Sequence, residues 1–253
     1  MGRILVKMLQ PSGANITICS RNPRRARTLC SRLGVTVRAE DSVQDADVVL
    51  VSVPIEKTVS TCERLLKIMK PHSLLIDVAS VKKGIVDKVV ASIPKNVEYL
   101  SIHPLFGPDT EKFKGENVLA INPKGGPLSK SILKFLSNNG LKTTHVTPDE
   151  HDRKTAVTQA LHHFAYASLA ACMSELIKKN DLQRFSTRSL RKTIDIIQSL
   201  SDNIDTILEI QERNPYAANS RRTFAQTASR LSRSRNGTNK RVTNQLKKLQ
   251  SIA

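Results

Sequence analysis

The sequence predicts an α/β protein: a doubly wound parallel sheet that lacks its first strand, followed by an all-helical domain. Short apolar runs alternate with amphipathic helical segments through the first half of the chain, which is the rhythm of βαβ units. The first predicted element is a helix, whereas a βαβ fold normally begins with a strand. Beyond about residue 148 only helical spacing remains. We therefore expect an α/β domain over residues 1–147 and a helical domain over residues 148–253.

The elements of the α/β half are predicted from apolar runs and helix signals. The runs at 47–54 and 73–78 are continuous, as in parallel strands that are covered on both faces. Pro23 suits the first turn of a helix, and Gly34 is a signal for the end of that helix. The predicted helices are 3–9, 23–33, 56–69 and 83–92, and the predicted strands are 14–19, 35–37, 47–54, 73–78 and 97–102.

The second half shows three helical segments. Residues 150–180 and 186–212 each carry apolar positions at helical spacing. The segment 214–250 has the same character, with a break near Asn236 and Gly237. Because antiparallel helices that bury an apolar stripe often pair two subunits, we expect a homodimer formed through this domain.

Composition excludes several classes of protein. Hydrophobic residues make up 39% of the 253, yet no apolar run approaches the roughly 20 residues that a membrane span needs. The N-terminus shows no signal-peptide pattern. The four cysteines form no CxxC pair, so we expect neither a metal site nor a disulfide framework. These features favour a cytoplasmic protein with reduced thiols.

The formal net charge is +18, from 40 Lys and Arg against 22 Asp and Glu. Basic residues gather around 21–27 and again at 221–253, where nine occur without an acid. Such charge is typical of nucleic-acid binding, or of a solvated surface that favours anionic substrates. Neither cluster carries a zinc-finger or RNA-recognition motif. We therefore expect a small-molecule substrate and no specific nucleic acid.

The N-terminal segment is similar to a dinucleotide-binding, Rossmann-like fold entered part-way. Such folds open with a strand, then G-x-G-x-x-G, then a helix whose N-terminus meets the pyrophosphate. Here Gly2 stands where the third glycine belongs, and residues 3–9 form the helix. The preceding strand and the first two glycines are absent from the sequence. We expect them to be encoded upstream, with Met1 as an internal start.

The expected cofactor is NADP, with NAD as the alternative. The second strand ends at Cys19-Ser20-Arg21, without the acid that usually bonds the ribose 2′-hydroxyl of NAD. The Arg21 guanidinium suits a 2′-phosphate. The alternative is an arginine that only caps a loop in a basic protein. The expected cofactor site lies at the first helix and after the strands: Gly2, Arg3, Ser20, Arg21, Val53, Pro54 and Ser80.

Two segments carry the candidate chemistry, each at the carboxyl end of a predicted strand. They are residues 77–84 (DVASVKKG) and 101–109 (SIHPLFGPD). Ligands of open α/β sheets bind outside these strand ends, so we expect Ser80 and His103 beside the nicotinamide ring. A neutral imidazole is a suitable general base near pH 7.

These segments resemble the prephenate dehydrogenase family of archaeal and bacterial tyrosine synthesis. DVASVK and HPLFGPD are similar to its signatures, as are TPDEHDR at 147–153 and QALHHF at 159–164. The resemblance covers about residues 1–215, and the combination is specific although each motif alone is weak. It implies oxidative decarboxylation of prephenate, or of arogenate, with hydride transfer to NAD(P).

The resemblance also implies roles for single residues. His103 accepts the proton of the substrate's ring hydroxyl, and Ser80 orients His103 and that hydroxyl. His163 lies near the substrate, on the same helix as Gln159. His151 is expected to hold the domain junction instead of taking part in the chemistry.

One departure concerns the substrate's carboxylate. Family members usually carry an arginine for it on the helix at 189–200, because Arg binds carboxylates through two hydrogen bonds. This chain has Ile197-Gln198-Ser199 at the aligned position. Arg188 and Arg191 are the expected substitutes, and the alternative is that both lie on a solvated helix face.

Two other functions stay open. One is another NADP-linked reductase of the same build, acting on an imine or a β-hydroxy acid; such enzymes usually place a Lys as the base, which argues against this alternative. The other is a truncated, non-catalytic paralogue that binds a polyanionic partner through its basic surface. The absent first strand favours the paralogue, whereas Ser80, His103 and His163 oppose it.

Overall fold

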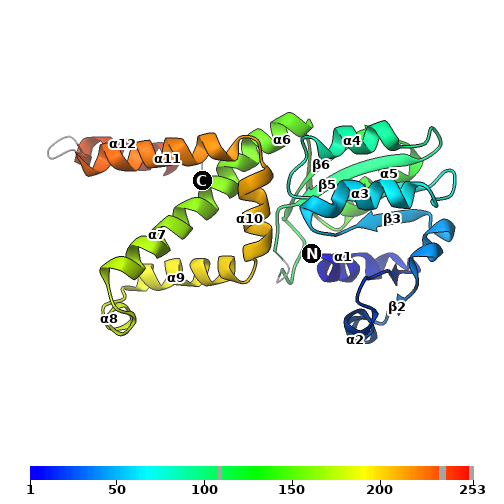
Figure 1. Cartoon of the computed structure of the whole chain (residues 1–253), viewed down its shortest axis with the longest axis horizontal. Coiled ribbons are helices and arrows are strands. Elements are labelled where there is room, and N and C mark those ends of the chain that lie inside the picture. The colour runs from blue at the N-terminus through cyan, green and yellow to red at the C-terminus, as the bar shows by residue number, and fades with distance from the viewer. Residues whose placement is uncertain (108–109, 234–237, 251–253) are drawn as a thin grey trace. The chain divides into compact units, whose positions relative to one another are not determined.

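The computed structural model describes residues 1–107, 110–233 and 238–250, and the chain divides into two compact units, Met1–Asp152 and Arg153–Ala253. The first unit contains the strands and the helices around them, and the second unit is helical (Figure 1). The chain passes from the first unit to the second within helix α6 (Pro148–Thr155).

The strands form two sheets, a two-stranded one of order β1-β2 and a five-stranded one of order β3-β4-β5-β6-β7. Their bounds are β1 (Thr17–Ile18), β2 (Thr36–Val37), β3 (Val48–Val51), β4 (Leu74–Asp77), β5 (Glu98–Pro104), β6 (Asn117–Lys124) and β7 (Lys142–His145). Neighbouring strands are parallel except β5 and β6, which are antiparallel. The predicted α/β class is confirmed, with one antiparallel pair that makes the sheet mixed.

The division into two sheets falls where the absent first strand belongs. In a doubly wound sheet that strand lies between the second and the fourth, which correspond here to β1 and β3. Among the described residues β1 pairs only with β2 and β3 pairs only with β4, so each has one edge without a strand partner. The prediction of a sheet without its first strand is confirmed.

The helices of the first unit follow the predicted order. They are α1 (Gly2–Leu9), α2 (Pro23–Leu33), α3 (Ile55–Leu66), α4 (Ile85–Ser92) and α5 (Pro127–Asn138). Pro23 begins α2, and Gly34 follows its last residue with φ of 63°, the left-handed conformation that ends many helices. The sequence did not predict β6, α5 and β7. In β7 the residues Lys-Thr-Thr-His are polar and mostly exposed, so the sequence has no apolar run that would predict this strand.

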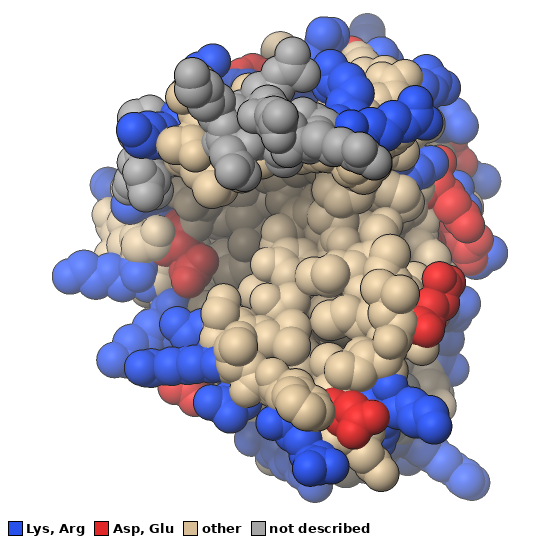
Figure 2. Space-filling model, turned by 90° about the vertical axis from the view of Figure 1, so that its left-hand side faces the viewer, with Lys and Arg blue, Asp and Glu red and all other residues tan. Residues whose placement is uncertain are grey.

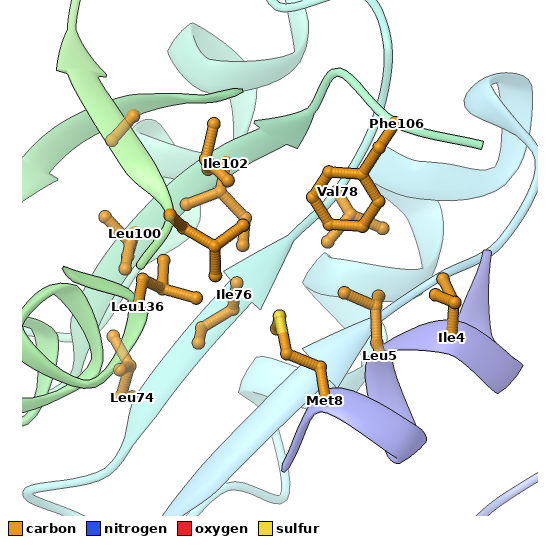
Figure 3. Packing of buried hydrophobic residues seen from close by; sticks show 13 residues of the cluster. Ile4, Leu5, Met8, Leu74, Ile76, Val78, Leu100, Ile102, Phe106 and Leu136 are labelled. Atoms are coloured by element: carbon orange, nitrogen blue, oxygen red, sulfur yellow. The ribbon is translucent and has the colours of Figure 1, made fainter. Parts of the chain in front are cut away.

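Helix α1 is held in place by the core of the sheet. Figure 3 shows Ile4, Leu5 and Met8 projecting from α1 toward side chains of β4 and β5, among them Ile76 and Ile102. Each buried aliphatic side chain contributes about 1.5–3 kcal/mol. An isolated eight-residue helix is marginal in water, so this burial is what stabilises α1. The packing sets the position of its first residue, Gly2.

The second unit holds the rest of the helices. They are the π-helical segment η3 (Ala156–Leu161), α7 (His162–Leu176), α8 (Lys179–Arg184), α9 (Arg188–Ser201), α10 (Ile204–Arg213), α11 (Ala217–Ser232) and α12 (Thr238–Gln250). The predicted helix 150–180 corresponds to α6, η3 and α7 in succession. The single helix predicted at 186–212 is wrong, because Asp202 and Asn203 separate α9 from α10. Asn236 and Gly237 lie outside the described residues.

None of the described helices is long and apolar enough to cross a membrane. Within the same residues, no group of three or more His, Cys, Asp or Glu side chains is arranged to hold a metal ion.

Candidate active site

His103 lies near the end of β5, between two strands that pair with β5 along this stretch. On one side Ser101 is in register with Asp77 of β4, and on the other side His103 is opposite Leu119 of β6. The side chain of His103 is buried, with 3% of the residue exposed. Because β4 and β5 are parallel, their carboxyl ends meet at one edge of the sheet, which brings the segment after Asp77 beside His103.

A chain of three buried side chains begins at His103. Its Nδ1 lies 2.9 Å from Nε2 of His151, and Nδ1 of His151 lies 2.7 Å from Oδ1 of Asp152. Helix α6 carries both His151 and Asp152. The carboxylate of Asp152 also accepts the backbone N–H groups of Lys82 and Lys83, at 2.9 and 2.8 Å. One carboxylate therefore holds both the loop after β4 and the histidine pair.

These hydrogen bonds assign the ring protons. The Asp152 carboxylate is an acceptor only, and its two oxygens accept the backbone N–H groups of Lys82 and Lys83. His151 must therefore carry its proton on Nδ1, and its Nε2 is an acceptor. His103 must donate from Nδ1 to that nitrogen, which leaves Nε2 of His103 with its lone pair. This is the tautomer that a general base at Nε2 requires.

Both histidines are neutral in this environment. Burial lowers the pKa of His103 well below 6.5, and the neighbouring His151 and Lys82 lower it further. Burial also lowers the pKa of His151, although its hydrogen bond to Asp152 opposes that effect. At pH 7 the ring of His103 is therefore an acceptor.

A second buried network supports the same edge of the sheet. The Nζ of Lys82, which is fully buried, donates to Oδ1 of Asp77 at 2.9 Å and to the Ile102 carbonyl at 2.8 Å. The Tyr99 hydroxyl donates to Oδ2 of Asp77 at 2.7 Å. These bonds join the ends of β4 and β5, immediately before Ser80 and His103.

Ser80 is half-buried in the loop after β4. No hydrogen bond joins Ser80 to His103 among the described residues, and the Nδ1 of His103 is bonded to His151. The contact of His151 with His103, and the hydrogen bond that holds His151 to Asp152, were not predicted from the sequence. An adjacent His-Asp pair on a helix was the available signal, but 48 positions separate residues 103 and 151.

The candidate cofactor residues lie at the start of α1 and after strands. Gly2 begins α1, and a Cβ at this position would lie 3.7 Å from Oγ of Ser52, in the loop after β3. The first turn of α1 therefore approaches the carboxyl end of β3. A helix N-terminus with a basic residue beside it suits a pyrophosphate, so these residues fit a dinucleotide. The other candidates are on the surface or half-buried: Arg3, Ser20, Arg21, Val53 and Pro54.

The candidate substrate residues of the second unit include two buried polar atoms that have no hydrogen-bond partner among the described residues. They are Oε1 of Gln159 and Nδ1 of His163, four residues apart at the junction of η3 and α7. Burial lowers the pKa of His163 to about 4, and His162 contributes to the shift. A buried polar atom without a hydrogen bond costs about 1–3 kcal/mol, which a bound polar ligand would recover. π-Helical turns often occur at functional sites. Arg191 is exposed on α9.

Two family models match most of the chain. The model for the nucleotide-binding domain of prephenate dehydrogenase matches residues 5–119, and the model for the dimerization domain of prephenate dehydrogenase matches residues 147–248. The chain belongs to the prephenate dehydrogenase family. The resemblance stated from the four sequence motifs is confirmed.

Two relatives in this family match 92% and 54% of this chain. A probable arogenate/prephenate dehydrogenase of Methanocaldococcus jannaschii is 27% identical over 244 residues, which are 92% of this chain and 54% of that protein. The prephenate dehydrogenase of Bacillus subtilis is 31% identical over 154 residues, which are 54% of this chain and 41% of that protein. The chain thus spans about half the length, or less, of these two relatives.

Solved structures of the prephenate dehydrogenase family share the fold. The prephenate dehydrogenase of A. aeolicus, in complex with hydroxyphenyl propionate and NAD+, matches with a TM-score of 0.81 at 19% identity, over 100% of this chain and 95% of that one. The arogenate dehydrogenase of Synechocystis matches with a TM-score of 0.71 at 20% identity, over 99% and 93% of the two chains.

Proposed function

We propose that this protein is an NAD(P)-dependent dehydrogenase that oxidatively decarboxylates prephenate or arogenate in tyrosine synthesis. The observation that carries the proposal is the buried His103 at the carboxyl end of β5, whose bond to His151 leaves Nε2 as a proton acceptor. Membership of the family supports it, as does the arogenate/prephenate dehydrogenase of M. jannaschii, which is similar over 92% of this chain.

The role of His103 follows from the chemistry of the substrate. A ring hydroxyl must lose its proton as its carbon becomes a carbonyl, and Nε2 of His103 accepts that proton. A bound nicotinamide supplies the acceptor for the hydride that leaves the same carbon. Loss of CO2 then makes the ring aromatic, so the reaction is effectively irreversible. Ser80, in the loop beside His103, is proposed to bond the same hydroxyl.

The cofactor and the substrate are proposed to be bound mainly by different domains. We propose that residues 1–147 bind the dinucleotide, with the pyrophosphate at Gly2 and Arg3 and the nicotinamide near Val53, Pro54 and Ser80. Arg21, exposed after β1, would bind the 2′-phosphate of NADP together with Ser20. Residues 148–253 supply the substrate groups. These are Gln159 and His163, whose buried atoms have no partner among the described residues, and Arg191 for a carboxylate.

We propose that the helical domain pairs two copies of the chain. The helices α7 and α9 contain no buried residue, although both carry many apolar side chains. Leu176 and Phe185, at and beyond the end of α7, are 85% and 72% exposed. Figure 2 shows this face as a broad uncharged surface with a hollow, bordered by charged residues that are mostly Lys and Arg. Apolar surface of this kind is usual where a partner covers it, and the dimerization-domain match favours a second copy as that partner.

The proposed activity is tested with four combinations of substrate and cofactor: prephenate or arogenate, each with NAD or NADP. We expect turnover with at least one combination, and we expect His103→Asn to lower kcat by at least about 100-fold, the low end for general base catalysis. The control is His145→Asn, because His145 is exposed at the end of β7. Near-wild-type turnover of His103→Asn would remove His103 from the mechanism. Cofactor binding without turnover of either substrate would favour the non-catalytic paralogue.

A further inference from the structure

A proton taken up by His103 brings a positive charge into a buried site. The described groups around His103 make its own ring a poor place for that charge. Burial, His151 and the ammonium of Lys82 all lower the pKa of His103. Lys82 is fully buried and ion-paired with Asp77. The Lys82 ammonium is therefore held in place, and it cannot move away from a positive charge on His103.

His151 is the better place for the charge. Its Nδ1 is 2.7 Å from the carboxylate of Asp152, whereas the ring partner of His103 is a neutral imidazole. Burial and Lys82 lower the pKa of His151, but the hydrogen bond that His151 donates to Asp152 and the charges of Asp152 and Asp77 raise it. The carboxylates therefore favour an imidazolium at position 151 over one at position 103.

We propose that His151 and Asp152 are positioning residues that take over this charge. As Nε2 of His103 receives the hydroxyl proton, Nδ1 of His103 passes its own proton to Nε2 of His151. The substrate O–H bond is replaced by N–H on His103, and the Nδ1–H bond of His103 is replaced by Nε2–H on His151. The 2.9 Å separation of these two nitrogens is within reach for such a transfer. No further reactant is needed, and the charge comes to rest against Asp152.

This inference rests on the proposed role of His103, and it makes two residues of α6 contribute to the basicity of a residue of β5. Among the described residues, titratable and charged groups that shift the pKa values of the histidine pair lie on three elements. They are Asp77 of β4, Lys82 of the following loop, and Asp152 of α6. Lys82 and Asp77 neutralise one another at 2.9 Å, so Asp152 is the carboxylate that decides where the charge lies.

The first test is the pH profile of kcat/KM for two variants. His151→Gln can place an amide oxygen near the former Nε2, which accepts the hydrogen bond from His103 but takes up no proton. Asp152→Asn keeps the shape of the side chain and removes its charge. We expect kcat at pH 7.5 to fall by about 10- to 10⁴-fold, the range seen when the partner of a functional histidine is lost. We also expect the acid limb to move to lower pH by about one unit, because the proton must now reside on His103.

The direction of the pH shift distinguishes the relay from a structural role. A merely structural role lowers the rate and leaves the acid limb in place, which would overturn the proposal. The matched control is Asp149→Asn, since Asp149 is on the same helix and its carboxylate pairs with Lys83 at the surface. It should leave both the rate and the profile unchanged.

The second test does not depend on catalysis. Side-chain ¹⁵N NMR of the histidines, assigned with the His103→Gln and His151→Gln variants, reports which ring nitrogens carry protons. In the ligand-free protein at pH 7.5 we expect both rings to be protonated on Nδ1. On acidification we expect the imidazolium signal at His151, with His103 becoming protonated on Nε2 alone. An imidazolium that forms first at His103 would overturn the relay. If no substrate is turned over, the proposed function fails while these spectra still decide the relay.

Discussion

Replacing Lys82 by Met tests the buried network beneath the candidate active site. The substitution keeps an unbranched side chain that is one atom shorter, and it removes the ammonium that bonds Asp77 and the Ile102 carbonyl, at 2.9 and 2.8 Å. Asp77 is then left as a buried charge with only the Tyr99 hydroxyl and the Ala79 N–H as described donors. Breaking a buried ion pair by removing one partner costs about 3–5 kcal/mol. A typical domain has about 5–15 kcal/mol of stability, so this loss is a large share of the total.

The assay is urea unfolding followed by circular dichroism, together with the melting temperature. For a chain of this size we expect Tm to fall by about 6–20 °C, from about 2–4 °C for each kcal/mol. The control is Lys83→Met, one residue later, where the ammonium bonds Asp149 at 2.9 Å with both side chains about half exposed. Such surface pairs contribute about 0–1 kcal/mol. If Lys82→Met costs less than about 1 kcal/mol, or no more than Lys83→Met, the network does not stabilise the sheet as argued.

Three further predictions concern the core, the histidines and the cofactor. Leu5→Ala, at a position 1% exposed on α1, should lower the free energy of unfolding by about 2–5 kcal/mol in urea titrations, and a loss below about 1 kcal/mol would show that α1 is not held by the sheet. Burial lowers the folded-state pKa of His103 and of His151, so the unfolded chain binds more protons below pH 6.5; stability should therefore fall from pH 6.5 to pH 5, by up to about 1.4 kcal/mol per pH unit for each ring, and a flat profile would contradict their burial. Arg21→Ala should weaken NADP binding far more than NAD binding in fluorescence titrations, whereas Arg24→Ala should affect both little; equal losses for the two cofactors would show that Arg21 does not bind the 2′-phosphate.

The sequence predicts those elements whose stability comes from their own residues. The strands β3 and β4 are continuous apolar runs, and α2 carries its own start and stop signals in Pro23 and Gly34. The strand β7 has no such run. Its side chains are polar and mostly exposed, and its backbone pairing with β6 stabilises it. The break between α9 and α10 contains neither Gly nor Pro. Because the apolar residues keep helical spacing on both sides of it, the sequence predicted one continuous helix.

In the candidate site, too, the sequence predicts what local structure determines and misses what distant contacts determine. Motif and strand position identified His103 from the sequence, because a residue at a strand's carboxyl end is placed by local structure. The contact between His103 and His151 depends on the return of the chain in α6, after β6, α5 and β7 have formed. Those three elements were not predicted, and without them nothing in the sequence brings position 151 to position 103. The role expected for His151, at the domain junction, came from the family resemblance and not from any predicted contact.

The unpaired edge of β3 has a consequence for a molecule made of residues 1–253 alone. This strand is Val48-Val49-Leu50-Val51, and β4 is its one strand partner among the described residues. A row of unsatisfied backbone groups on an apolar strand is a template for pairing with another chain. The net charge of +18 opposes that encounter, because like-charged molecules repel one another before their edges meet. At an ionic strength of 1 M this repulsion acts over only about 3 Å. Concentrated salt should therefore promote association through strand edges. At low salt the basic surface opposes this association.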